Sequence, residues 1–322
     1  MKILIIQSSF PGDCILATSL IESVYASHPE AEIHFLLRKG NEALFQQHPL
    51  LKKLWIWDKK KKYSSALDLI RSFRKEKFDR IVNVQRFFMT GLMTLLSAPK
   101  KSIGFDKNPL SFLFSIKRKH FFAETLHETD RNFALIQDFC QHALPPKLYP
   151  PQVDIVEKPY LVLAPASVWF TKQWPEKYWI ELGKEMRKDF DIVLMGGPAD
   201  ADLCSRIEQG IGDSVHNVCG KYSLLESAGI IKKARAIVCN DSAPAHLATA
   251  VNTPTVQIYC STITQFGFWA KAEKTVILQT EEDLACRPCS LHGKEACPLQ
   301  HFACGFSIAP IRVKQALFKV LN

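Results

Sequence analysis

Short apolar runs alternate with stretches of helical periodicity along the first 150 residues. Residues 3–6 are apolar throughout, as expected of a strand buried on both faces, and helical spacing follows over 15–27. The same alternation continues with strands predicted at 33–37, 54–57 and 80–83, and with helices predicted at 43–48, 63–75, 90–96 and 130–142. This rhythm predicts a parallel, doubly wound α/β sheet.

A proline-rich segment divides the chain. Residues 144–152 contain four prolines, which cannot hold regular structure, and we predict a linker there. The rhythm then restarts, with strands predicted at 160–163, 191–195, 216–218, 236–239 and 255–259, and helices at 174–189, 199–209, 223–233 and 243–250. We therefore predict an α/β fold of two Rossmann-like parallel-sheet domains, 1–150 and 151–322, facing across a cleft. The amphipathic segment 310–320 predicts a C-terminal helix that packs back on the first domain.

The net charge of +9 belongs entirely to the first half. Residues 1–150 contain 23 Lys and Arg against 14 Asp and Glu, whereas residues 151–322 contain 18 of each. A basic surface attracts nucleic acid, anionic membranes or anionic substrates. The lysine run 59–62 alone is typical of a solvated face, but basic and aromatic residues interleave over 112–122. That mixture favours a membrane-interface or acceptor-binding surface.

No segment approaches the ~20 consecutive apolar residues of a membrane-spanning helix. The apolar N-terminal run is short and ends at polar residues 7–9, which is typical of a first strand and not of a signal peptide. Ten cysteines without an export signal indicate the reducing cytoplasm, where thiols stay free or bind metal.

Three polar residues gather where the apolar run 236–239 ends. Asp241 and Ser242 are good N-cap types, and His246 follows one turn into the predicted helix, on the same side. A strand end beside a helix N-terminus with free N–H groups is where phosphorylated ligands bind in an open α/β sheet. An ordinary capped helix, whose Asp and Ser only satisfy backbone donors, is the alternative.

Three other loops at strand ends carry unusual residues. After the first strand, Gly12 allows a tight turn and Asp13 opens the next helix, where a plain N-cap carboxylate is the simpler interpretation. No G-x-G-x-x-G follows that strand, which argues against an NAD enzyme. The loop 165–175 gathers two hydroxyls and a cation, and the loop 195–200 holds a glycine pair that is also common in turns.

Together these loops resemble glycosyltransferase family 9, the ADP-heptose:lipopolysaccharide heptosyltransferases. The matching motifs are P-G-D at 11–13, T-K-x-W-P at 171–175, G-G-P at 196–198, and N-D-S-A-P-A-H-L-A at 240–248 followed by T-P-T-V. The resemblance runs essentially the full length, and the tail 297–310 is most similar to the heptosyltransferase II branch. It implies a GT-B fold and an inverting transfer that needs no metal or other cofactor.

The resemblance also implies roles for individual residues. Asp13 would be the general base that deprotonates an acceptor hydroxyl, and Lys172 would neutralise the diphosphate as ADP departs. The nucleotide sugar would be held by residues of the second domain: Ser167, Thr171, Lys172, Gly196, Gly197, Tyr222, Asp241, Ser242, Ala243 and His246. Where relatives carry a Glu after the glycine-rich loop, this chain has Asp200.

The implied partners are an ADP-heptose donor and a lipid A–Kdo inner-core acceptor, which can already carry a heptose. An anionic, lipid-anchored acceptor fits the charge excess of the first half. The expectation is therefore a cytoplasmic protein, peripheral on the anionic inner face of the inner membrane, with no nucleic-acid partner.

A compact cysteine cluster lies near the C-terminus, formed by Cys286, Cys289, Cys297 and Cys304. Such spacing can build a structural zinc site, although only one C-x-x-C is present, and a family loop of free thiols is the alternative.

Three other functions compete with the heptosyltransferase interpretation. They are a GT-B transferase for another sugar nucleotide, a basic nucleic-acid or zinc-binding module, and an inactive relative acting as a scaffold. The cysteines and the excess charge lie in opposite halves, which argues against the second of these.

Overall fold

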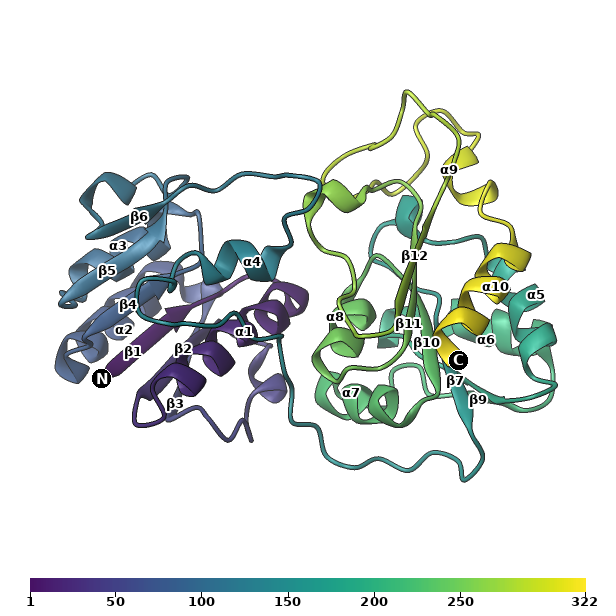
Figure 1. Ribbon diagram of the computed structural model, residues 1–322, viewed down its shortest axis with the longest axis horizontal. Coiled ribbons are helices and arrows are strands. Elements are labelled where there is room, and N and C mark those ends of the chain that lie inside the picture. Colours follow the sequence, from purple (N-terminus) through teal and green to yellow (C-terminus); the bar gives the residue numbers. More distant parts are fainter. The chain divides into compact units, whose positions relative to one another are not determined.

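Two units make up the chain. The computed structural model describes all 322 residues and divides them into Met1–Tyr149 and Pro150–Asn322, one residue from the boundary predicted above. Each unit holds one six-stranded sheet whose strands all pair in parallel (Figure 1). No helix in the chain combines the length and the apolar character that crossing a membrane requires.

The first unit begins in the middle of its sheet, whose strand order is β3-β2-β1-β4-β5-β6. The strands are β1 (Lys2–Ile6), β2 (Glu32–Arg38), β3 (Lys53–Trp57), β4 (Arg80–Asn83), β5 (Lys101–Phe105) and β6 (Ile116–Arg118). The helices are α1 (Pro11–Ser27), α2 (Lys62–Glu76), α3 (Phe88–Leu96) and α4 (Glu128–Phe133). Since β1 pairs with β2 on one side and β4 on the other, the strand order reverses at β1, and α1 starts at this switch point.

The second unit repeats this topology with the order β12-β11-β10-β7-β8-β9. Its strands are β7 (Tyr160–Ala164), β8 (Asp191–Leu194), β9 (Val215–Asn217), β10 (Ala236–Asn240), β11 (Thr255–Tyr259) and β12 (Thr275–Gln279). Its helices are α5 (Glu176–Met186), α6 (Ala201–Ile211), α7 (Leu224–Lys233), α8 (Ala243–Ala250), α9 (Ala303–Phe306) and α10 (Pro310–Leu321). Figure 1 shows α7 and α8 on one side of this sheet and α5, α6 and α10 on the other. Here the strand order reverses at β7, which lies between β8 and β10.

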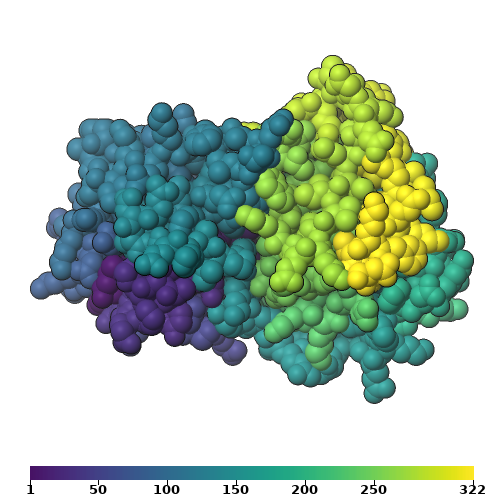
Figure 2. All heavy atoms as spheres, in the orientation of Figure 1, coloured from purple at the N-terminus to yellow at the C-terminus, as the bar shows by residue number.

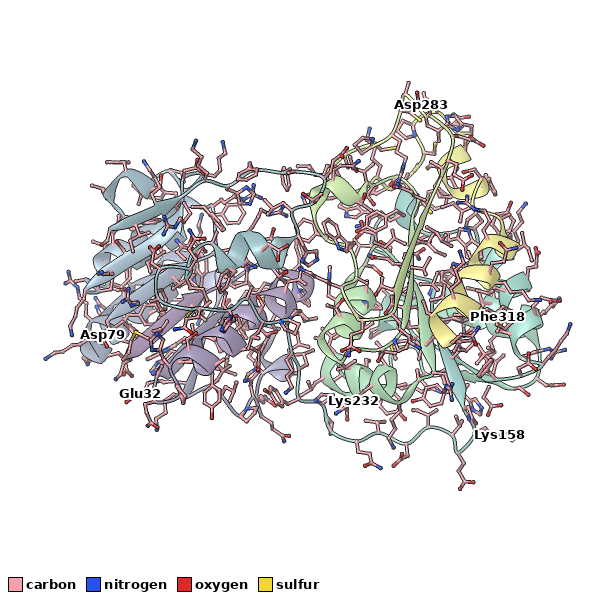
Figure 3. The ribbon with its side chains drawn as sticks, in the orientation of Figure 1. Glu32, Asp79, Lys158, Lys232, Asp283 and Phe318 are labelled. Carbon is pink, nitrogen blue, oxygen red and sulfur yellow. The ribbon has the colours of Figure 1, made fainter.

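The C-terminal helix α10 forms but does not use its apolar face as predicted. Val313, Ala316, Leu317 and Val320 are buried in the core that the second unit builds under α5 and β10–β12. The yellow C-terminal segment lies against the teal part of the same unit in Figure 2. The face that was expected to pack on the first unit is therefore occupied within the second. Phe318, on the outer face, is 41% exposed (Figure 3).

Some predicted elements differ from the observed ones. The helix predicted over 130–142 ends at Phe133 and continues as tight turns, with Leu135 N–H donating to Asn132 O (3.0 Å). The helix predicted over 43–48 is a single 3₁₀ turn, Glu42–Leu44. Strands β5, β6 and β12 were not predicted, and β6 and β12 follow connections that contain only 3₁₀ turns and thus break the strand–helix rhythm.

Candidate functional site

The loops that follow β7 and β10 are tied together at the switch point of the second sheet. Asn240, the last residue of β10, is fully buried, and its Nδ2 donates to Pro165 O (2.7 Å). Its Oδ1 accepts the N–H of Trp174 (3.0 Å). One side chain therefore holds both ends of the loop 165–174 against β10.

Replacing Asn240 by alanine is expected to lower the free energy of unfolding by about 2–5 kcal/mol, because two buried backbone groups lose their partner. Urea unfolding followed by tryptophan fluorescence measures this loss. Asn217→Ala is the matched control, since Asn217 also makes two hydrogen bonds at a strand end but is half-buried. Equal losses of unfolding free energy in the two variants would contradict the proposed role of Asn240 in holding the loop 165–174.

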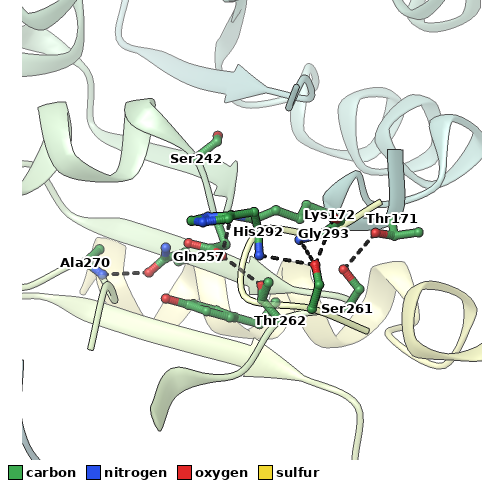
Figure 4. A network of polar contacts seen from close by, with 12 residues as sticks. Thr171, Lys172, Ser242, Gln257, Ser261, Thr262, Ala270, His292 and Gly293 are labelled. Carbon is green, nitrogen blue, oxygen red and sulfur yellow. Dashed lines mark hydrogen bonds and ion pairs between the residues drawn. The ribbon is translucent and has the colours of Figure 1, made fainter. Parts of the chain in front are cut away.

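A buried ion pair lies at the same point. Lys172 Nζ is 2.6 Å from Asp241 Oδ2, and the two side chains are only 14% and 9% exposed. Thr262 donates its hydroxyl to the same oxygen (2.8 Å). Figure 4 shows the long Lys172 side chain running into this network. The loop after β7 thus delivers a cation to the loop after β10, in a place with little water to screen it.

The alternative of an ordinary capped helix is wrong for both polar residues before α8. Ser242 is the N-cap residue of α8, but its side chain makes no cap hydrogen bond and instead donates to Ala166 O (3.4 Å). Asp241 is engaged with Lys172 and Thr262. The backbone N–H at the start of α8, at Ala243, has no side-chain cap, and a helix N-terminus of this kind favours an anion.

Buried polar atoms without partners surround Asp241. His246 is 7% exposed, its Nδ1 has no hydrogen-bond partner, and burial lowers its pKa to about 4, so the ring is neutral at pH 7. Gln257 Nε2 and the Tyr259 hydroxyl are also buried beside Asp241 without a hydrogen bond of good geometry. Burial, and next the charge of Asp241, raise the pKa of Tyr259 well above its usual value. Unpartnered buried groups are rare in native proteins and indicate a place for a ligand or water.

The predicted residues Ser167, Thr171, Gly196, Gly197 and Tyr222 have other surroundings. Thr171 is 1% exposed, and its hydroxyl oxygen accepts from Ser261 Oγ (3.0 Å) and Lys294 N–H (2.8 Å). We therefore interpret Thr171 as a residue that holds its loop. Ser167 is half-buried on the same loop, where its carbonyl accepts from Gln173 Nε2 (2.7 Å).

The glycine pair lies at the end of β8, away from the contacts that join Lys172 and Asp241. A Cβ on Gly196 would come within 3.0 Å of the side chains of Asp200 and Cys219, which explains the glycine by packing. Gly197 N–H donates to Asp200 Oδ2 (2.8 Å), so this carboxylate closes the turn. Tyr222 is half-buried, one residue before the N-cap Ser223 of α7, and is not part of the network around Asp241.

Thr262, Gln257 and Tyr259 complete the site but were not singled out from the sequence. The signal was present as polar residues in the otherwise apolar run T-V-Q-I-Y, followed by Cys260-Ser-Thr262. Their importance depends on β11 pairing with β10, which local sequence does not reveal.

The four clustered cysteines are free thiols. Cys286, Cys289 and Cys297 line a cavity of about 190 Å³ together with Lys294. No group of three or more His, Cys, Asp or Glu side chains in the chain is arranged to hold a metal ion. The zinc site that this spacing could build is therefore not formed by the side chains as they lie.

Asp13 lies in the first turn of α1, at the switch point of the first sheet. It occupies the third helical position and is not the N-cap, which is Phe10. Burial raises its pKa to about 7, with the negative charge of Glu128 as the next cause, while the N–H of Phe10 and the charge of Arg86 oppose the rise. A carboxyl group with such a pKa can gain or lose a proton near neutral pH.

A basic cavity of about 530 Å³ lies beyond the carboxyl ends of β2 and β3. Its lining includes Arg38, Lys39, Lys59 and Lys60, together with one acidic residue, Asp58, which pairs with Lys39 (3.2 Å). Lys59 Nζ donates to Ser8 O (2.6 Å) in the loop that leads to α1, and burial lowers the pKa of Lys59. Lys59, Lys60, Lys61 and Lys62 are all exposed, as the interpretation of a solvated face expects, although Lys59 also makes this hydrogen bond.

Known proteins resemble this chain over most of its length. It is 27% identical to lipopolysaccharide heptosyltransferase 3 of Escherichia coli, over 79% of this chain and 82% of that protein. It is 23% identical to lipopolysaccharide heptosyltransferase 1 of Pseudomonas aeruginosa, over 93% and 88%. The solved structure of E. coli ADP-heptose LPS heptosyltransferase II matches with a TM-score of 0.78 at 22% identity, covering 100% of this chain and 98% of that one.

This structural likeness confirms the predicted fold class, two Rossmann-like units of the GT-B type. The family model described as glycosyltransferase family 9 (heptosyltransferase) matches residues 66–295. The family suggested by the sequence motifs is thereby confirmed, and the chain belongs to glycosyltransferase family 9, the heptosyltransferases.

Proposed function

We propose that this protein transfers a heptose from ADP-heptose to the inner core of lipopolysaccharide, with inversion at the anomeric carbon. The observation that carries the proposal is the buried Lys172–Asp241 pair beside the uncapped N-terminus of α8, at the switch point of the second sheet. Family membership supports the reaction class. The names of the relatives support both the lipopolysaccharide acceptor and the ADP-linked donor. These relatives include types 1, 2 and 3, so assignment to the type II branch stays a prediction.

The second unit would bind the donor. The backbone N–H of Ala243 at the start of α8 and the ammonium of Lys172 are suited to the diphosphate. Asp241, once released from its pair with Lys172, is suited to a sugar hydroxyl. Negative charge grows on the diphosphate as the bond to the anomeric carbon breaks. A hydrogen-bond donor that already points at this developing charge stabilises the transition state by about 3 kcal/mol. Neutral His246 would offer its unpartnered Nδ1 as a hydrogen-bonding atom to the bound nucleotide sugar.

The first unit would bind and activate the acceptor. Asp13 would take the proton from the acceptor hydroxyl while that oxygen attacks the anomeric carbon from the face opposite ADP. The new C–O bond forms as the old one breaks, and ADP departs with the electron pair. The basic cavity around Lys59 and Arg38 fits the acidic groups of a Kdo and phosphate-bearing acceptor.

Action at the inner face of the inner membrane is part of this proposal. Exposed Phe112 and Phe121 lie on the connections before and after β6. They are close in sequence to exposed Lys117 within that strand and to exposed Lys119 just after it. Aromatic rings beside cations suit the boundary of an anionic bilayer.

The first test is calorimetric titration of ADP, UDP, GDP and NAD into the purified protein, with and without Mg²⁺. We expect selective binding of ADP that EDTA does not weaken, since Lys172 and the helix N-terminus supply the positive charge. Preference for UDP or GDP would overturn the donor, and a requirement for Mg²⁺ would overturn metal independence. Absence of nucleotide binding would favour the scaffold alternative. Turnover with Kdo–lipid A, bare or heptosylated, then identifies the acceptor.

A further inference from the structure

The segment between β12 and α9, residues 280–302, returns to the polar network around Asp241 after an outward excursion. We call it the cysteine loop, because it contains Cys286, Cys289 and Cys297. Asp283 marks its outer tip in Figure 3. Two stretches of this loop contact the network, one at Arg287 and one at Gly293.

Arg287 donates hydrogen bonds to the backbone of residues 260–262, the segment that follows β11. Its Nε donates to Cys260 O (2.7 Å), and its Nη2 donates to Thr262 O (2.6 Å). Nη2 also donates to Gln279 Oε1 (2.9 Å) at the end of β12. The carbonyls on both sides of Ser261 are therefore fixed by one guanidinium, whose planar fork sets two directions at once.

Residues 260–262 include Thr262, whose hydroxyl bonds Asp241. Thr262 donates to Asp241 Oδ2, the same oxygen that Lys172 contacts. Ser261, between the two fixed carbonyls, donates to Thr171 Oγ1, and its own carbonyl accepts from Cys289 N–H (3.2 Å). A shift of this segment would move the hydroxyl that bonds Asp241 and the contacts of Thr171, the residue before Lys172.

Arg287 is held without an acidic partner. Its acceptors are backbone carbonyls and an amide oxygen, the residue is half-buried, and burial lowers its pKa. Burying a cation without an anionic partner costs free energy. A residue kept despite such a cost is typical of a functional site.

The second contact reaches Lys172 directly. Gly293 has φ +90°, and a Cβ there would lie 2.9 Å from Lys172 Cγ, so the loop packs closely on the lysine stem. Figure 4 draws Gly293 and Lys172 side by side. The cysteine loop thus contacts Lys172 at one end and, through Thr262, Asp241 at the other.

We propose that Arg287 is a positioning residue of the nucleotide-sugar site: by fixing the carbonyls of Cys260 and Thr262, it aims the Thr262 hydroxyl at Asp241 and so sets the Lys172–Asp241 pair. The inference rests on the proposed function, in which that pair binds the donor.

The test compares Arg287→Met and Arg287→Lys with the matched control Arg312→Met. Arg312 also bonds near the end of β12, to Glu281 Oε1 (2.6 Å) and Gln279 O (3.5 Å), but makes no contact with Cys260 or Thr262. We expect Arg287→Met to raise the ADP Kd and the donor KM about tenfold, the effect of one misdirected hydrogen bond to a charged group. Arg287→Lys should recover part of this loss, and Arg312→Met should match the wild type.

A double-variant cycle with Thr262→Val tests the route. If Arg287 acts through Thr262, the double variant binds ADP no more weakly than the worse single variant. Additive losses, or a wild-type Kd and KM in Arg287→Met, would overturn the inference. If Arg287→Met does not fold, the same cycle built on Arg287→Lys decides. Failure of the proposed function looks different, because the wild-type protein itself would then neither bind ADP nor turn over.

Discussion

Replacing Asp13 by asparagine is expected to lower kcat by about 10²–10⁴-fold, the usual contribution of a general base. Asparagine keeps the size of the side chain but cannot take a proton from the acceptor hydroxyl. ADP binding should stay unchanged, since the predicted donor residues all belong to the second unit. Steady-state kinetics with ADP-heptose, alongside ADP titration, separates the two effects.

The pH profile of the wild type gives an independent test of Asp13. The base must be ionised, and burial raises its pKa to about 7, so kcat/KM should fall about tenfold per pH unit below that value. The stability effect has the opposite sign. Because the folded-state pKa lies above the usual 3.8, folding favours the protonated carboxyl, and stability is lost as the pH rises from about 4 to 7. Asp13→Asn should therefore be more stable than the wild type at pH 8.

Glu22→Gln is the control for Asp13→Asn. Glu22 lies on the same helix, and burial raises its pKa too, but its carboxylate accepts from the hydroxyl of Tyr149 (3.1 Å), the last residue of the first unit. This variant should keep the wild-type kcat. Wild-type turnover in Asp13→Asn, or a flat pH profile between 5 and 8, would remove Asp13 from the reaction.

The parts of the fold that local sequence predicted are those with a local cause. Strand β10 and helix α8 were predicted almost residue by residue, because the apolar run 236–239 ends at Asn-Asp-Ser and Pro244 suits a first helical turn. Strand β12 was not predicted, since its half-buried edge position follows a loop with no regular helix. Helix α10 was predicted, but the unit on which it packs depends on contacts with residues far away in the sequence.

The same distinction holds for the site. Motifs identified Lys172 and Asp241 separately, yet nothing local indicates that they form an ion pair, since 68 positions separate them and strand order brings them together. Arg287 was missed because it lies in a loop without regular structure and bonds backbone atoms, which leave no sequence signal. The roles of Asp13 and Lys172 themselves stay predictions for kinetics to test.

Replacing Lys172 by methionine is expected to lower kcat by about 10²–10³-fold, the effect of removing one preorganised donor from developing charge. The structure adds a complication, because Asp241 would then be a buried carboxylate whose cation is gone. Leaving such a charge unpaired destabilises a protein by up to about 3–5 kcal/mol. The single variant therefore loses both activity and stability, and activity alone cannot show which loss matters.

A second variant separates these effects. Lys172→Met combined with Asp241→Asn removes both charges, so it should regain much of the stability in urea unfolding while transfer stays as low as in the single variant. Lys294→Ala is the control. It also removes a lysine side chain, but this side chain is exposed, and Lys294 bonds Thr171 only through its backbone N–H. Recovery of turnover together with stability in the double variant would show that Lys172 only balances a buried charge. Low turnover in a restabilised protein, well below the turnover of Asp241→Asn alone, would place the Lys172 ammonium on the departing diphosphate.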